Sequence, residues 1–347
     1  MKTKAAILVA LNEPLVVDEI EMPKLECGQV LVRIDKSGIC GAQLNEIGGA
    51  KGPDKFLPHL LGHEGGGEVL EIGPGVTHVK PGDTVTLHWR KGAGIHAQTA
   101  KYNWNGKQVN SGWVTTFSEH SIVSENRVTK ISPKTDLEIA ALMGCAVTTA
   151  FGLINNDAQV KIGQSVVVLG CGGVGLNIVQ GAAMVAAHPI VGVDIVEKKL
   201  EMAKRFGATH TLNSKGVADL AHELAQLVPG GKFDVFIETT GNVKLIELAY
   251  RLTASQGKTI LVGVPRHDQD ITIHSLPLHF GMVLKGCEGG QSNPTLDIPR
   301  YLSLVDAGKL QLKELITHRF PLEKINDALD LMRKGEAGRC IVEMNSR

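Results

Sequence analysis

The middle of the chain contains a hydrophobic run followed at once by a glycine-rich turn, and this pair restricts the possible folds more than any other feature. Val166-Val167-Val168-Leu169 is typical of a buried strand, and Gly170-Cys171-Gly172-Gly173-Val174-Gly175 follows it directly. In such a turn Gly170 allows the tight bend, Gly172 lets the backbone approach a pyrophosphate, and Gly175 lets the next helix pack on the strand. The pattern predicts a dinucleotide site at a helix N-terminus.

An acidic residue supports the dinucleotide interpretation. Asp194 ends the next strand-like run, Ile190 to Asp194, nineteen residues after Gly175. A carboxylate there accepts hydrogen bonds from the ribose hydroxyls and repels a 2′-phosphate. We therefore expect NAD rather than NADP. The residues alone leave open an ordinary surface βαβ turn, and we expect the side chain of Cys171 to have no role in the turn.

The chain is long enough for two domains, because 347 residues exceed one ordinary core. Its first 150 residues are β-rich, with short apolar runs separated by turn residues. A middle segment from about residue 152 to 288 alternates strand-like and helix-like runs, which indicates a parallel sheet covered by helices. The tail has helical patterns near Pro299 to Ala307 and Leu322 to Arg333, then a strand-like Arg339 to Met344.

Composition excludes several classes of partner. Lys plus Arg equals Asp plus Glu at 36 each, so we expect neither nucleic acid nor a membrane surface as partner. Ser165 to Val193 carries no charge and is long enough to cross a bilayer, but six glycines interrupt it, so we expect strand, turn, helix and strand instead. The six cysteines show no disulfide framework and the N-terminus shows no signal peptide, so we expect a cytoplasmic protein.

Three separate fragments carry potential metal ligands. They are Gly38-Ile39-Cys40-Gly41, Gly62-His63-Glu64 and Gly144-Cys145. Two thiols and one imidazole are a ligand set of open, catalytic zinc sites. We expect Cys40 on a loop after a strand at Val30 to Ile34, and Cys145 just before a helix. Because the spacing is wide, buried structural cysteines and a core histidine remain an alternative at this point.

Taken together, these fragments resemble the zinc-dependent alcohol dehydrogenase family of the medium-chain dehydrogenases/reductases. The matching segments run in the same order over nearly the whole chain: Gly62 to Val76, Val79-Lys80-Pro81-Gly82-Asp83, Gly144-Cys145, the glycine turn, Leu261-Val262-Gly263-Val264-Pro265 and Ile316-Thr317-His318. The resemblance implies an α/β protein in which a Rossmann doubly wound parallel sheet, residues 152–288, is inserted into a mainly-β, GroES-like catalytic domain, residues 1–151 and 289–347. Zinc and nicotinamide would meet in the cleft between the domains.

The resemblance also implies specific roles. Cys40, His63 and Cys145 would ligate the zinc, and Glu64 would sit behind the metal and could transiently replace its water. The metal would polarise an alcohol, whose carbon then gives a hydride to the nicotinamide. The cofactor would be contacted by Thr149 and Val174 at the nicotinamide, Lys199 at the adenosine ribose, Arg339 at the pyrophosphate and the backbone of Val264 at the carboxamide. The family further suggests a homodimer or homotetramer.

The chain departs from this family in its metal content. Many relatives carry a lobe with four closely spaced cysteines after the Pro-Gly-Asp turn, whereas residues 88–119 of this chain contain no cysteine. We therefore expect one catalytic zinc per chain and no structural zinc. We interpret His88 and His96 as solvated or pocket-lining histidines.

A second departure concerns the proton that the alcohol loses. Relatives usually place Ser or Thr, and often a histidine, where this chain has Ala42 and Asn45, and neither can titrate near pH 7. Gln43 replaces the usual acid, and we expect its amide oxygen to accept from His63. The proton must then leave through water, a substrate hydroxyl, or a side chain such as Glu46 or His88.

The third departure is a polar, basic insert that carries Trp89, Arg90 and Trp104. Such side chains suit a sugar ring and its hydroxyls, so we expect a polyhydroxylated alcohol such as a polyol, sugar or cyclitol. The alternative is a surface loop that packs its own aromatic residues. Two other functions remain open: a redox-neutral enzyme that uses NAD as an epimerase or cyclase does, and a non-enzymatic dinucleotide-binding protein.

Overall fold

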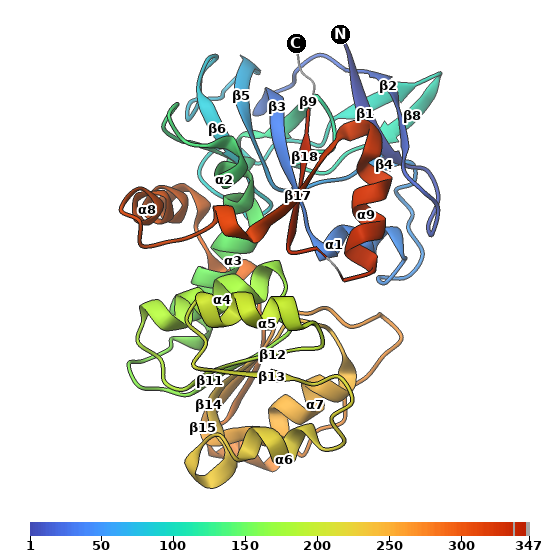
Figure 1. Ribbon diagram of the computed structural model, residues 1–347. Coiled ribbons are helices and arrows are strands. Elements are labelled where there is room, and N and C mark those ends of the chain that lie inside the picture. The colour runs from blue at the N-terminus through green and yellow to red at the C-terminus, as the bar shows by residue number, and fades with distance from the viewer. Residues whose placement is uncertain (336, 345–347) are drawn as a thin grey trace. The chain divides into compact units, whose positions relative to one another are not determined.

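The computed structural model describes residues 1–335 and 337–344. The chain folds into two compact units, one formed by Met1–Ala146 with Asn293–Arg347 and one by Val147–Ser292. The middle of the chain is therefore inserted into a unit built by its two end segments (Figure 1). The inserted unit begins five residues before and ends four residues after the predicted 152–288, because helix α3 (Thr148–Gly152) contacts helix α4 (Gly173–Met184) and the turn Gly289–Gln291.

The unit formed by the chain ends is mainly β. Its strands are β1 (Lys2–Leu8), β2 (Val16–Glu21), β3 (Gln29–Ile39), β4 (His59–Leu60), β5 (Gly65–Ile72), β6 (Thr84–Leu87), β7 (Lys101–Trp104), β8 (Lys107–Asn110), β9 (His120–Ser124), β10 (Val128–Lys130), β17 (Ile316–Pro321) and β18 (Arg339–Glu343). Strands β1, β2, β7, β8 and β4 close into a small barrel. The other sheet has the order β10-β6-β5-β3-β18-β17, with β9 also paired to β3.

Four α-helices accompany these strands in the part of this unit that the structure describes: α1 (Gly41–Ile47), α2 (Leu137–Leu142), α8 (Pro294–Asp306) and α9 (Ile325–Arg333). Alternate residues of β3, such as Val30, Val32 and Ile34, are buried in the core of this unit. The C-terminal strand β18 pairs antiparallel with β3, placing Cys340 opposite Ile39. This pairing brings the last strand next to the segment that carries Cys40.

The inserted unit contains one parallel sheet with helices on both faces. Its strands are β11 (Val166–Leu169), β12 (Ile190–Asp194), β13 (His210–Asn213), β14 (Phe233–Glu238), β15 (Thr253–Leu261) and β16 (Val283–Gly286), in the order β13-β12-β11-β14-β15-β16. Helices α4 and α5 (Glu197–Arg205) cover one face, and α6 (Leu220–Ala225) and α7 (Val243–Leu252) cover the other (Figure 1). The predicted Rossmann sheet inserted into a mainly-β domain is confirmed.

Two local expectations need correction. The strand expected at Val30 to Ile34 continues to Ile39, so Cys40 follows it directly. The polar insert contains a hairpin, since β7 and β8 pair around Asn105 and Gly106, which both have positive φ. Such a two-residue turn suits the twist of a hairpin, and Asn-Gly is a favoured sequence for it.

The uncharged stretch Ser165 to Val193 forms β11, the glycine turn, α4 and most of β12, as expected. By length and composition, one helical stretch among the described residues could cross a membrane. This stretch, Leu137–Ala158, has a mean hydropathy of 1.8, but 89% of its most apolar window is buried inside the protein. That burial is typical of a core helix.

Candidate functional site

The three predicted metal ligands come together within the unit formed by the chain ends. Cys40 lies between β3 and α1, His63 lies between β4 and β5, and Cys145 lies in the helical stretch after α2. Their ligand atoms all lie within 4.8 Å of one another. The buried Nε2 of His63 has no hydrogen-bond partner among the described residues, so its lone pair is free for a metal. Two thiols and an imidazole at this separation fit a zinc ion.

The ionisation of the two thiols depends on their contact with each other. The hydrogen bond with Cys145 holds the pKa of Cys40 well below its ordinary value, although burial opposes this effect. The same contact raises the pKa of Cys145 well above its ordinary value. Burial alone would lower the pKa of His63, but the adjacent Cys40 thiol outweighs it and the net shift is upward. A cation in this position would compensate the negative charge that the thiols develop.

Gln43 contacts two ligand residues, but not as the sequence predicted. Its Oε1 accepts from the backbone N–H of Cys40 at 2.9 Å, and its Nε2 lies 2.5 Å from Nδ1 of His63. The expectation that the amide oxygen would accept from His63 is wrong. The reason is that Cys40 is the N-cap residue of helix α1. The side chain of Gln43 reaches back to the backbone N–H of Cys40, and this hydrogen bond uses the amide oxygen.

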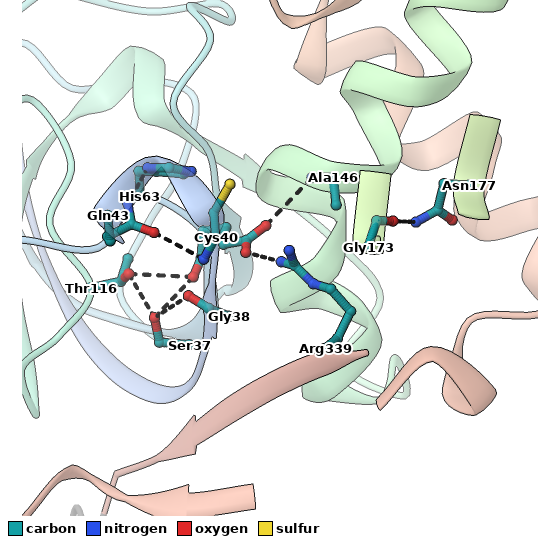
Figure 2. Close-up of polar contacts among 11 residues, drawn as sticks. Ser37, Gly38, Cys40, Gln43, His63, Thr116, Ala146, Gly173, Asn177 and Arg339 are labelled. Carbon is teal, nitrogen blue, oxygen red and sulfur yellow. Dashed lines mark hydrogen bonds and ion pairs between the residues drawn. The ribbon is translucent and has the colours of Figure 1, made fainter. Parts of the chain in front are cut away.

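Glu64 is fully buried beside the ligands and pairs with Arg339. Burial raises the pKa of Glu64, and the charge of Arg339 opposes this rise. Figure 2 shows Ser37 and Thr116 side by side, with their hydroxyls 2.7 Å apart. These hydroxyls donate to the carbonyl oxygen of Glu64 at 3.1 and 3.3 Å. The expected contact of Arg339 with a pyrophosphate stays a prediction.

A glycine next to the first ligand makes room for this buried carboxylate. A Cβ atom at Gly38 would lie 2.5 Å from Oε1 of Glu64, closer than any real Cβ contact. In the sequence Gly38 is visible only as part of the motif around Cys40, and this role was not predicted from it. The signal was a glycine two residues before a cysteine ligand, but nothing in the sequence linked it to Glu64.

The glycine turn of the inserted unit has the geometry that a dinucleotide site requires. Gly170 has φ +93, and a Cβ at Gly175 would lie 1.9 Å from the Gly170 carbonyl oxygen, so a side chain is excluded there. A Cβ at Gly172 would meet nothing within 4 Å, so the backbone is open on that side. Helix α4 begins at Gly173, immediately before Val174, and directs its free N–H groups toward this turn.

Asp194 is held at the end of β12 by two backbone groups. Its Oδ2 accepts from the N–H of Cys171 at 2.8 Å, and its Oδ1 accepts from the N–H of Val196 at 3.0 Å. Each oxygen keeps a further lone pair for a ribose hydroxyl. The backbone of Cys171 thus orients the Asp194 carboxylate. Burial raises the pKa of the Cys171 thiol to about 12.

The remaining predicted cofactor residues have different surroundings. Thr149 is buried and its Oγ1 has no partner among the described residues, which leaves the hydroxyl free for a ligand. Lys199 is half-buried on α5, and Val264 is exposed just after β15. Their contacts with a cofactor stay predictions.

Comparison with known proteins places the chain in a family. Residues 26–133 match the alcohol dehydrogenase GroES-like domain, and residues 173–306 match the zinc-binding dehydrogenase domain. The S-(hydroxymethyl)glutathione dehydrogenase of Paracoccus denitrificans is 32% identical over 99% of this chain and 100% of its own length. The chain belongs to the zinc-dependent alcohol dehydrogenase family. It is a zinc-dependent alcohol dehydrogenase that uses NAD(P).

Solved structures of this family share the fold over nearly the full length. The benzyl alcohol dehydrogenase of Acinetobacter calcoaceticus is 25% identical, covers 99% of both chains and has a TM-score of 0.88. The 2R,3R-butanediol dehydrogenase of Bacillus subtilis is also 25% identical, covers 99% of this chain and 100% of its own, and has a TM-score of 0.79.

In this alcohol dehydrogenase, a carboxylate joins the loop before the Pro-Gly-Asp turn to the insert that follows the turn. Glu125 accepts from the backbone N–H groups of Thr77, His78 and Ile95 at 2.7, 2.8 and 2.7 Å. Burial alone would raise the pKa of Glu125, but these N–H groups outweigh it and hold the pKa below its ordinary value. The ionised carboxylate therefore links these loops through hydrogen bonds.

The interpretation of His88 as solvated or pocket-lining is wrong. His88 is fully buried, its Nδ1 lies 2.8 Å from the Arg90 carbonyl oxygen, and its Nε2 lies 2.9 Å from Oγ1 of Thr129. Burial lowers the pKa of His88 to about 4. Because both ring nitrogens are engaged, His88 is a poor proton carrier for the reaction.

The tryptophans of the insert pack mainly on their own unit. Trp104 lies on β7, packs against the barrel core and donates from Nε1 to Asp18 at 2.7 Å. Trp113 is half exposed and stacks on the ring of His96, with centroids 4.7 Å apart. Trp89 differs, because its Nε1 is buried without a hydrogen-bond partner among the described residues. The expectation that Trp104 lies in a loop is therefore wrong, because it lies in a strand. The indole N–H of Trp89 remains a donor without an acceptor among the described residues.

Proposed function

We propose that this alcohol dehydrogenase is NAD-specific and acts on a polar, hydroxyl-bearing alcohol. The observation that carries the enzymatic assignment is the approach of Cys40, His63 and Cys145, whose ligand atoms lie within 4.8 Å of one another. A zinc ion held by these three residues supplies a Lewis acid that polarises an alcohol or carbonyl oxygen. Glu64 and Arg339 support the ligand shell from behind with a buried ion pair.

The preference for NAD rests on Asp194. Its carboxylate is oriented by two backbone N–H groups and is only half-buried, so it is available to the ribose. A 2′-phosphate at the same place would face a fixed negative charge. This arrangement supports NAD over NADP.

The preference for a polar substrate rests on Trp89. Its backbone N–H donates to the carbonyl of Gly144, the residue before the ligand Cys145, at 3.3 Å. Its buried Nε1 has no acceptor among the described residues, and a substrate hydroxyl would supply one. Two relatives are named for polar substrates, butanediol and S-(hydroxymethyl)glutathione, which is compatible with this proposal.

The test is NADH formation by zinc-loaded protein across a panel of alcohols. The panel contrasts ethanol and benzyl alcohol with butanediol, polyols, sugars, cyclitols and S-(hydroxymethyl)glutathione, and Cys40→Ser is the inactive control. We expect turnover with NAD and a polar member, at least about ten-fold above that with the simple alcohols, since one lost hydrogen bond in a buried site costs about 1–3 kcal/mol. Equal turnover of ethanol would contradict the polar assignment. If no alcohol of the panel gave NADH although NAD was tightly bound, the redox-neutral alternative would be favoured.

The metal content is part of the proposal. We expect one zinc per chain, held by Cys40, His63 and Cys145, because Glu125 already links the insert after the Pro-Gly-Asp turn to the loop before that turn. Elemental analysis of purified protein measures this ratio, and Cys40→Ser should reduce it toward zero. Two zinc ions per chain would show that a structural site exists.

We further propose that two copies of the chain associate through the β16 edge of the sheet. Strand β16 pairs with β15 on one side only, and the preceding segment exposes Leu276 at 53% and Phe280 at 66%. An exposed apolar segment beside an open strand edge favours pairing with another chain. Sedimentation of wild-type protein and Phe280→Asp tests this, with a dimer or larger assembly expected only for the wild type.

A further inference from the structure

We infer that Glu238 is a positioning residue for the nicotinamide carboxamide, acting through the carbonyl of Val264. Glu238 ends β14 at the carboxyl edge of the parallel sheet, where ligands of such sheets bind. It is fully buried, and no cation pairs with it in the part of the chain that the structure describes. The inference rests on the proposed function, because it requires a nicotinamide cofactor.

The Glu238 carboxylate holds the loop that follows β14. Its Oε1 accepts from the N–H of Thr240 at 2.6 Å and from the Thr240 hydroxyl. The N–H of Gly241 is shared between the two oxygens, at 3.0 Å from Oε2 and 3.1 Å from Oε1. These donors satisfy the buried charge and fix the loop from Thr239 to Gly241 in one conformation.

The backbone carbonyl of Glu238 holds a second loop, the one that follows β15. It accepts from the N–H of Val262 at 2.7 Å and from that of Gly263 at 3.0 Å. One residue therefore anchors both loops, the first through its side chain and the second through its main chain.

The two loops touch each other at Gly241 and Val264. Gly241 has φ +75, and a Cβ there would lie 2.7 Å from the carbonyl oxygen of Val264. The position of the Val264 carbonyl thus depends on where the carboxylate of Glu238 holds Gly241. This carbonyl accepts no hydrogen bond from the described residues, so it is free to accept from a ligand amide.

The same loop also reaches the glycine turn. The hydroxyl of Thr239 donates to the carbonyls of Leu169 and Gly170 at 2.9 and 3.0 Å. The loop after β14 therefore connects the segment expected to bind the pyrophosphate with the segment expected to bind the carboxamide. A carboxylate that fixes this loop sets the spacing between the two.

The experiment compares three ligands for wild type and Glu238→Gln: NAD, ADP-ribose, and 3-acetylpyridine adenine dinucleotide, which lacks the amide N–H that Val264 would bind. In wild type we expect NAD to bind about five-fold tighter than the acetylpyridine analogue, the typical effect of one neutral hydrogen bond. In Glu238→Gln an amide N–H₂ replaces Oε2 and repels the Gly241 N–H, which keeps only its 3.1 Å contact with the remaining oxygen. The loop therefore shifts, and we expect this preference to fall toward one. Affinity for ADP-ribose should change less than two-fold.

Glu223→Gln removes a charge from the exposed face of α6 and should leave all three affinities unchanged. If Glu238→Gln fails to fold, Thr240→Val removes one donor to the same carboxylate and should reduce the NAD preference in the same direction. Equal weakening of all three ligands would show a merely structural role, and an unchanged preference would also overturn the inference. A wild-type protein that binds neither dinucleotide would overturn the proposed function, and this inference with it.

Discussion

Arg339 donates from Nη2 to Oε1 of Glu64, and both side chains are buried, at 4% and 0% exposure. Glu64 follows the ligand His63, and Arg339 begins β18, the strand that pairs with β3 just before Cys40. Two opposite charges therefore compensate each other directly beside the metal ligands. Glu64 could not stay ionised at this depth alone, since burial by itself raises its pKa.

This pair predicts a large loss of stability when one partner is removed. Arg339→Met leaves a buried carboxylate without a cation, and we expect the free energy of unfolding to fall by about 3–5 kcal/mol. Arg319→Met is the matched control, because Arg319 pairs with Glu138 at 2.8 Å but is 46% exposed, and it should cost no more than about 1 kcal/mol. Urea denaturation of the zinc-free proteins measures both. Similar losses for the two variants would contradict the prediction.

Asp194 predicts the cofactor preference. Asp194→Asn removes the charge that repels a 2′-phosphate and weakens the ribose contacts, so we expect the ratio of NAD to NADP affinity to fall by about ten- to hundred-fold, the effect of charge-assisted hydrogen bonds. Fluorescence titration with NADH and NADPH measures the ratio. Glu197→Gln, on the neighbouring helix α5, should leave it within about two-fold of wild type. A wild type that binds both cofactors equally would refute the assigned role.

Glu46 is the side chain that remains for proton exit once His88 is excluded. It lies on α1 one turn after Ala42, is half-buried, and makes no side-chain hydrogen bond or ion pair with the described residues. We expect Glu46→Gln to lower kcat for alcohol oxidation by about 10²-fold or more, the usual contribution of a general base. Adding Asn45→His to this variant should restore part of the lost activity, because the histidine supplies a titrating group at the preceding position of the helix.

The control for Glu46 is Glu13→Gln, which removes an exposed carboxylate from the same unit. Zinc content and NAD affinity should be the same in all these proteins, so that only kcat and its solvent isotope effect change. A Glu46→Gln enzyme with wild-type kcat would show that water or a substrate hydroxyl carries the proton.

His88 predicts a loss of stability in acid. Its pKa is lowered by burial to about 4 in the folded protein, against 6.5 for the unperturbed group. Between these values the unfolded chain binds a proton that the folded chain does not. The contribution of His88 to the free energy of unfolding is therefore fully present above pH 6.5 and is lost as the pH decreases toward 4. The loss from this residue is about 3 kcal/mol. Urea denaturation of zinc-free protein measures the free energy of unfolding at pH 7 and at pH 5. The decrease between the two pH values should be smaller for His88→Gln than for wild type, whereas the exposed-site variant His210→Gln should show the same decrease as wild type.

Features that depend on local backbone chemistry could be predicted from the amino-acid sequence. The glycine turn from Gly170 to Gly175 could be placed because only glycine permits that bend and that close approach of helix to strand. Asp194 could be placed at the end of β12 from the apolar run that precedes it, whereas its contact with a ribose stays a prediction. The metal ligands needed the family resemblance, since no spacing rule connects Cys40 with Cys145.

The contacts between segments that are distant in the sequence became visible with the three-dimensional fold. Glu64 and Arg339 are 275 residues apart, and their pairing depends on β18 adding to the sheet beside β3. The burial of His88 and the packing of Trp104 on the barrel likewise depend on neighbours from other strands. Sequence patterns encode which face of an element is apolar, whereas the partner of a buried polar atom is set by three-dimensional packing between segments, which no local pattern contains.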